Sequence, residues 1–64
     1  MQGSEVKAIR LALGASHTEL SRALGIHRAN IYRWETKGID GLPETVMILL
    51  RDHPRVWKWL NARK

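Results

Sequence analysis

Residues 16–38 read SHTELSRALGIHRANIYRWETKG, and this stretch decides the fold. It consists of two short amphipathic segments on either side of Gly25, a residue type that accepts the positive φ needed where a helix ends. The apolar side chains of the two segments recur at helical spacing: Leu20, Leu24, Ile26, Ile31 and Trp34. Because both segments share one small apolar core, we expect two helices that cross at a steep angle.

The beginning of this helix pair is also marked in the sequence. Ser16, followed three residues later by Glu19, is a capping box and starts the first helix. The second helix is expected from about Arg28 to Thr36. Two helices joined by a tight turn that contains glycine form a helix-turn-helix, whose second helix enters the major groove of DNA. The stretch of about 16–37 therefore predicts a DNA-binding unit.

Two segments within this stretch resemble a known family. Residues 20–26 (LSRALGI) and 28–35 (RANIYRWE) resemble the core of the Cro/phage-repressor (XRE-like) family, with its small–x–x–x–Gly–aliphatic turn and its apolar–x–x–aromatic–Glu ending. The resemblance covers roughly Val6 to Leu50. It implies an all-α, compact five-helix, lambda-repressor-like fold, and we expect residues 1–64 to form a single domain of this kind.

Two residues depart from the family pattern. Ser21 stands where Ala is usual, and His27 stands where Ser or Thr usually caps the recognition helix. Serine is small enough for the turn, and histidine can still reach a phosphate or a base edge.

The sequence on either side of the pair predicts three further helices and no strand. The first is expected from about Ser4 to Leu13. Pro43 and Pro54 are each expected at the first position of a later helix, where a missing N–H is harmless. These C-terminal helices, residues 43–62, are expected to complete the core and to form a dimer interface.

The first C-terminal helix has more apolar residues than one face can bury. Val46, Leu49 and Leu50 are expected to point inward, with Met47 and Ile48 partly spare.

The two tryptophans of the last helix cannot both be buried, because Trp57 and Trp59 lie about 200° apart around a helix. Trp59 shares a face with Val56 and Leu60 and is assigned to the core, which leaves Trp57 at the surface. An exposed large aromatic often anchors an interface. We therefore expect a homodimer whose interface contains Met47, Val56, Trp57 and Leu60, the alternative being a monomer in which Trp57 covers its own preceding helix.

A second resemblance lies in the same region. Residues 49–60 (LLRDHPRVWKWL) resemble the end of the helix-turn-helix half of certain antitoxins, which act as dimers on palindromic operators. The zinc-binding half of those antitoxins has no counterpart here, so toxin neutralisation is not expected. A two-fold dimer would place two recognition helices about 34 Å apart, one turn of DNA.

Composition agrees with a nucleic-acid partner. Among 64 residues, 11 Lys and Arg against 6 Asp and Glu give a net charge of +5, which favours a polyanion. There is no Cys, no H-E-x-x-H motif and no Gly-rich phosphate loop, so we expect no enzyme activity, no metal and no cofactor. No apolar run is long enough to span a membrane and no signal peptide is visible, so we expect no membrane contact and a cytoplasmic location.

The recognition helix is expected to direct one face toward DNA. With Ile31 and Trp34 directed inward, the opposite side carries Ala29, Tyr32 and Arg33, with Arg28 on its flank. These four residues and His27 are the base-reading candidates. Arginine can donate two hydrogen bonds to O6 and N7 of guanine, and alanine can contact the thymine methyl group. The alternative is a solvated helix face.

Phosphate contacts are expected around that face, from His17, Thr18, Asn30, Thr36 and Lys37. The N-terminal amides of the helix that follows Ser16, together with its dipole, favour a phosphate oxygen. The role of His17 is implied by the resemblance, since the family commonly contacts the backbone from this position. The alternative is an exposed surface histidine.

Glu35 points about 40° from Ile31 around the helix, toward the body of the protein. The resemblance implies that it pairs with an arginine of the first helix, which here is Arg10. The pair would attach the recognition helix to the scaffold.

Together these features predict a sequence-specific regulator of transcription, a homodimeric repressor of a phage or mobile-element operon that binds an inverted repeat in double-stranded DNA. Two alternatives remain open. One is a protein-interaction or antitoxin-like module that uses the Trp57 surface, and the other is a non-specific binder of nucleic acid or anionic membrane.

Overall fold

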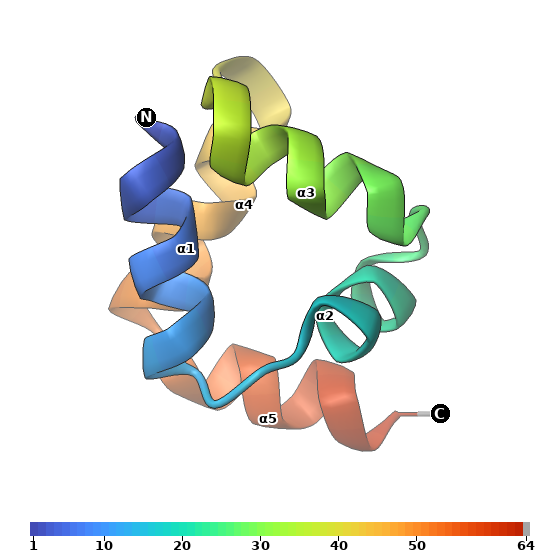
Figure 1. The fold of residues 1–64 in the computed structure, drawn as a ribbon. Coiled ribbons are helices and arrows are strands. Elements are labelled where there is room, and N and C mark those ends of the chain that lie inside the picture. The colour runs from blue at the N-terminus through green and yellow to red at the C-terminus, as the bar shows by residue number, and fades with distance from the viewer. Residues whose placement is uncertain (64) are drawn as a thin grey trace.

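The computed structural model describes residues 1–63 and contains five α-helices and no strand within that range (Figure 1). The helices are α1 (Gly3–Ala12), α2 (His17–Leu24), α3 (Arg28–Lys37), α4 (Gly41–Asp52) and α5 (Pro54–Ala62). The predicted all-α, five-helix class is confirmed. Lys64, which the predicted domain includes, lies outside the described residues.

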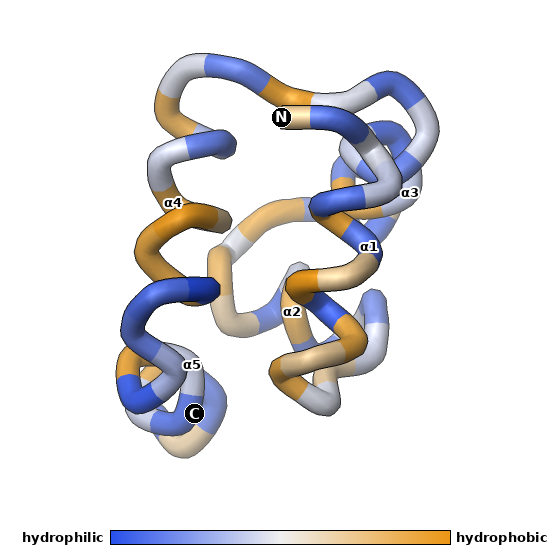
Figure 2. Tube along the Cα trace, turned by 90° about the vertical axis from the view of Figure 1, so that its left-hand side faces the viewer, coloured by the Kyte–Doolittle hydropathy of each residue, from blue (hydrophilic) through white to orange (hydrophobic). Residues whose placement is uncertain are grey.

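The helices surround one core, and α3 and α5 lie on different sides of it. Helix α3 packs against α1 and α2, whereas α5 packs against α2 and α4, and α1 also contacts α4. Figure 1 shows α3 and α5 at opposite ends of the molecule with α2 between them. Hydrophobic residues are concentrated in α4, and hydrophilic ones predominate in α3 (Figure 2). The most polar helix is therefore held in place by the first two helices.

The ends of α2 form as the sequence predicts. The Ser16 hydroxyl accepts a hydrogen bond from the Glu19 N–H at 3.0 Å, and the Glu19 carboxylate accepts one from the Ser16 N–H at 3.0 Å. Gly25 ends the helix at φ +70°, a conformation that an L-residue with a side chain rarely adopts. Both ends of α2 are thus fixed by local chemistry, which sets the direction in which the chain enters α3.

Some predicted helix boundaries were wrong by one or two residues. Helix α1 begins at Gly3, not Ser4, and ends at Ala12, and α3 extends one residue further, to Lys37. Helix α4 begins at Gly41, so Pro43 occupies its third position, not its first. The first four N–H groups of a helix have no partner within the helix, so proline fits anywhere in that turn.

The approach of α1 to α3 depends on a glycine. A Cβ atom built on Gly3 would overlap the main-chain carbonyl oxygen of Glu35. The absence of a side chain therefore lets the start of α1 lie against the end of α3. This contact brings the rest of α1 alongside α3.

The core draws buried side chains from all five helices and the α1–α2 loop: Val6, Ile9, Ala15, Leu20, Ile31, Met47, Leu50 and Trp57. In α4 the predicted inward set was only partly right. Leu50 is buried, Val46 is half-buried against the core, but Leu49 is 47% exposed and Met47, predicted as spare, is fully buried. Met47 and Leu50 are three residues apart and point the same way, and the remaining helices select that stripe.

In α5 the prediction for the two tryptophans was wrong. Trp57 is 5% exposed and belongs to the core, whereas Trp59 is 63% exposed. Val56 and Leu60 lie between the two tryptophans around the helix, so either tryptophan completes an apolar stripe with them. Packing against α2 and α4 decides the rotation of α5, and that information is not local to the helix.

Candidate nucleic-acid interface

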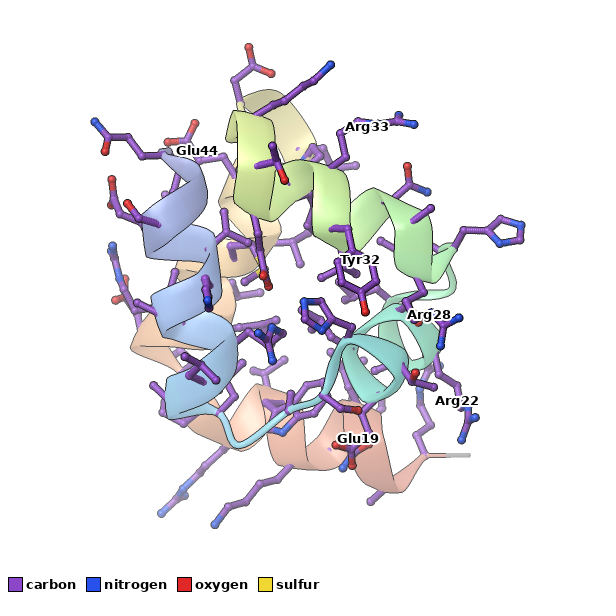
Figure 3. All side chains as sticks on the ribbon, in the orientation of Figure 1. Glu19, Arg22, Arg28, Tyr32, Arg33 and Glu44 are labelled. Atoms are coloured by element: carbon purple, nitrogen blue, oxygen red, sulfur yellow. The ribbon has the colours of Figure 1, made fainter. Side chains whose placement is uncertain are left out.

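The outward face of α3 consists of the residues opposite its core contact. Ile31 is fully buried and Trp34 is half-buried, as predicted from the spacing. The residues of α3 that face solvent are Arg28, Ala29, Tyr32, Arg33, Thr36 and Lys37. Figure 3 shows Arg28 and Arg33 extending from α3, with Arg22 of α2 on the same side of the molecule. An α-helix with this exposed face has the size and the donors that a major groove accepts.

The charge on α3 is divided between two sides. Arg28, Arg33 and Lys37 are exposed, whereas Glu35, the single carboxylate of the helix, turns inward with a side chain only 11% exposed. The outward face of α3 therefore carries positive charge without an acidic neighbour from the same helix. Such an arrangement attracts a polyanion.

Glu35 forms the ion pair that the resemblance implies. The Arg10 Nε donates to the Glu35 Oε2 at 2.6 Å, and the two side chains are 8% and 11% exposed. Arg10 also donates from Nη1 to the main-chain oxygen of Ala15 at 2.9 Å. A guanidinium with two fixed acceptors joins α1, the α1–α2 loop and α3, which holds the recognition helix against the scaffold.

His17 makes contacts that the sequence analysis missed. Its Nε2 lies 3.1 Å from the second carboxylate oxygen of Glu35, and its ring is stacked on the ring of Tyr32 with centroids 4.1 Å apart and planes 13° apart. No spacing rule links residues 15 positions apart on different helices, so periodicity contained no signal for this stack. His17 was predicted as a phosphate ligand, and the structure places its ring between Glu35 and Tyr32.

The protonation of Glu35 follows from these partners. Partial burial raises the pKa of Glu35, but the hydrogen bonds from Arg10 and His17 and the positive charge beside them outweigh it, so the pKa lies below its ordinary value. Glu35 is therefore ionised at neutral pH and acts only as an acceptor.

The other predicted contact residues lie around the same surface. The Arg28 Nη1 is 3.4 Å from the Thr18 hydroxyl, and the Thr36 hydroxyl donates to the main-chain oxygen of Tyr32 at 2.9 Å. His27 is exposed at the N-cap of α3 without a side-chain capping bond, and Asn30 is half-buried. His27, Arg28 and Thr18 therefore lie together at the N-terminal end of α3, next to α2.

The unusual serine of the turn is accommodated. Ser21 is buried, and its hydroxyl donates to the main-chain oxygen of Thr18 at 2.9 Å. A buried hydroxyl with a partner carries little penalty. This explains how serine occupies a position where the family usually has alanine.

The predicted dimer interface was wrong at its two principal residues. Met47 and Trp57 are buried in the core of one chain, so they are not available to a second copy. Val56 and Leu60 are half-buried and pack against the same core. The large aromatic that α5 leaves at the surface is Trp59.

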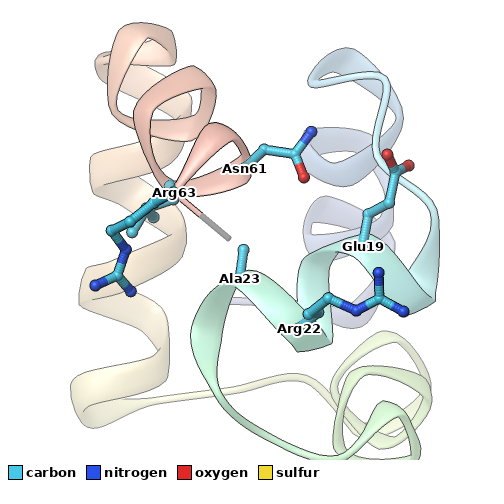
Figure 4. Close-up of a pocket in the computed structure, with 6 residues that line it drawn as sticks. Glu19, Arg22, Ala23, Asn61 and Arg63 are labelled. Atoms are coloured by element: carbon cyan, nitrogen blue, oxygen red, sulfur yellow. The ribbon is translucent and has the colours of Figure 1, made fainter.

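A surface pocket of about 300 Å³ lies away from α3, between α2 and α5 (Figure 4). It is lined by Glu19, Arg22, Ala23, Leu60, Asn61 and Arg63.

Among residues 1–63 no group of three His, Cys, Asp or Glu side chains gathers as metal ligands would. In the same range no helix has the length and apolar character needed to cross a membrane.

The comparison with protein families agrees with the geometry. A family model described as helix-turn-helix matches residues 6–52, which is most of the chain. The chain belongs to this helix-turn-helix family, of the XRE type, and is a DNA-binding regulatory domain. No curated protein and no solved structure matches it.

Proposed function

We propose that this domain is a sequence-specific transcriptional repressor that binds an inverted repeat in duplex DNA as a homodimer. Helix α3 enters the major groove, and the bound protein blocks the promoter that contains the repeat. The observation that supports this proposal is the division of α3 into two sides. Two arginines face solvent, and the one carboxylate is bound to Arg10 on the opposite side.

The base contacts in this proposal come from the outward face. Arg33, in the middle of α3, and Arg28, at its N-terminal end, each donate two hydrogen bonds to a guanine, and Ala29 contacts a thymine methyl group. Lys37 and the N-terminal end of α2, including Thr18, contact phosphates on either side of the groove. These phosphate contacts fix the register and make the affinity depend strongly on salt.

The homodimer is proposed from the size of the domain. Its extents are 28 × 23 × 19 Å, so one copy covers about one half-site. Recognition helices on successive turns of DNA are about 34 Å apart, which brings two such copies within side-chain reach of each other. The interface is not assigned to Met47 or Trp57, because both are buried.

The test is a selection of random double-stranded DNA by the purified full chain, repeated with Arg33→Ala. Lys58→Ala is the matched control, because it removes an exposed positive charge from α5, away from the recognition helix. We expect one inverted repeat with half-sites about one helical turn apart. Arg33→Ala should lose about 1–3 kcal/mol of discrimination at one base pair of each half-site. Lys58→Ala should select the same sequence as the wild type.

Two other outcomes of this selection would contradict the proposal in whole or in part. If the wild type, Arg33→Ala and Lys58→Ala bind every duplex with equal, salt-sensitive affinity, the protein is a charge-driven binder and the proposal is wrong. Enrichment of a single half-site without a repeat would reject the homodimer and keep the specific readout. The protein-interaction alternative based on a Trp57 surface has no support, because that side chain is buried.

A further inference from the structure

A continuous chain of contacts runs from the scaffold to the outward face of α3. It starts at the main-chain oxygen of Ala15, which accepts from Arg10 at 2.9 Å, and Arg10 donates to Glu35 at 2.6 Å. Glu35 binds the His17 Nε2 at 3.1 Å, and the His17 ring is stacked on Tyr32. Tyr32 is thus the outer end of a series of contacts that involves α1, α2 and α3.

The His17 ring is fixed in place by its contacts with Glu35 and Tyr32. Glu35 is ionised and can only accept, so the His17 Nε2 carries a hydrogen and donates it to the carboxylate. One face of the ring is covered by Tyr32, and the side chain as a whole is 22% exposed. The Nε2 atom is therefore occupied by Glu35, and the ring is held in one orientation.

Tyr32 combines exposure with restraint. Its side chain belongs to the outward face of α3 and the residue is 51% exposed, yet one face of its ring is fixed by His17 (Figure 3). Within residues 1–63 its hydroxyl has no hydrogen-bond partner, so both its donor and its acceptor capacity are free. An aromatic side chain held in one rotamer loses little entropy on binding.

We infer that Tyr32 reads one base pair of the half-site through its hydroxyl, and that His17 is the positioning residue that makes this reading selective. The inference rests on the proposed function, since it places α3 in the major groove. A phenol fixed by stacking reaches a defined point on a base edge, whereas a freely rotating phenol would reach several. His17 therefore acts on the DNA through Tyr32 and not as a phosphate ligand.

Three substitutions separate the two roles of His17. His17→Phe keeps an aromatic ring for the stack and removes every polar contact. His17→Gln keeps a polar side chain of similar reach and removes the stack. Tyr32→Phe keeps the stack and removes the hydroxyl. Each full-length variant is first melted in solution to establish that it is folded.

The measurement is the affinity of each variant for the selected duplex and for every single base-pair substitution in one half-site. Tyr32→Phe should reduce discrimination at one base pair by about three- to tenfold, the value of one hydrogen bond, and leave the other positions unchanged. His17→Gln should reduce discrimination at the same base pair, and His17→Phe should retain it. The double variant His17→Gln/Tyr32→Phe should lose no more than Tyr32→Phe alone, because both act through one hydroxyl.

A second measurement does not involve DNA. Stacked rings shift each other's proton resonances, so the Tyr32 ring protons of the free wild type should have displaced chemical shifts. The displacement should persist in His17→Phe and disappear in His17→Gln.

Two results would overturn the inference. If His17→Phe weakens every duplex equally and His17→Gln binds like the wild type, His17 is a phosphate ligand. If Tyr32→Phe weakens all sequences equally, the hydroxyl binds the backbone and reads no base. Failure of the proposed function gives a different result. In that case the wild type selects no sequence and Arg33→Ala changes nothing, and the inference about Tyr32 is then wrong as well.

Discussion

Helices α3 and α5 each direct one tryptophan toward the core and one large aromatic toward solvent, but the outward side chains are supported differently. On α3, Tyr32 is stacked on His17 of a neighbouring helix, which in turn binds Glu35. On α5, Trp59 has the Arg63 guanidinium 5.2 Å from its ring, a contact with the end of its own helix. The outward surface of α3 is therefore organised by other helices, and preorganisation of this kind favours specific binding.

The largest expected effect on stability comes from the buried tryptophan of α5. Trp57→Ala removes a large, nearly fully buried side chain from α5 and should destabilise the protein by about 3–5 kcal/mol. A domain of this length has a total stability of only a few kcal/mol, so the variant should be largely unfolded at 25 °C. Trp59→Ala is the control and should change the free energy of unfolding by less than about 1 kcal/mol, because Trp59 is 63% exposed. Urea unfolding followed by circular dichroism measures both, and the reverse order would show that α5 is rotated the other way.

The contrast between α3 and α5 also explains which parts of the fold could be predicted from the sequence. The α2–α3 unit was predictable because its signals are local: a capping box at Ser16, a positive φ at Gly25 and inward residues at helical spacing. The rotation of α5 was not predictable, because Val56 and Leu60 form an apolar stripe with either tryptophan. The contacts of α2 and α4 decide between them, and these contacts exist only in the folded chain.

The candidate site divides in the same manner. The inward direction of Glu35 follows from its angle to Ile31, and a family resemblance supplies Arg10 as its partner. The stack of His17 on Tyr32 depends on the distance and angle between two helices, which neither periodicity nor the family pattern contains. Sequence reasoning therefore predicted which residues lie on the outward face of α3 and missed the contact between His17 and Tyr32.

A smaller effect is expected from the ion pair that holds α3. Arg10→Met leaves Glu35 poorly exposed and without its principal cation, which should cost about 3 kcal/mol. The matched control is Arg51→Met, which breaks the pair of Arg51 with Asp52 beside α5. Both side chains of that pair are about half exposed and screened by solvent, so the loss should be much smaller than that for Arg10→Met. Equal losses in the two variants would show that the Arg10–Glu35 pair contributes no more than a surface contact.

The smallest expected effect is a pH dependence of stability that comes from Glu35 of α3. The folded-state pKa of Glu35 is lowered, so its ionised form contributes stability above the unfolded-state pKa of about 4.3, and this contribution is lost as the pH falls through the folded-state value. The difference in unfolding free energy between wild type and Glu35→Gln should therefore be greatest near neutral pH and should shrink below about pH 4. Asp52 also has a lowered pKa, because of its hydrogen bond from Arg51, but both proteins contain it and it cancels in the difference. The lowered pKa belongs to a carboxylate of α3, so this pH dependence reports on the attachment of α3. A pH-independent difference would mean that the charge of Glu35 does not hold α3 in place. Urea unfolding from about pH 3, below the ordinary pKa of glutamate, to about pH 7, well above it, makes this measurement.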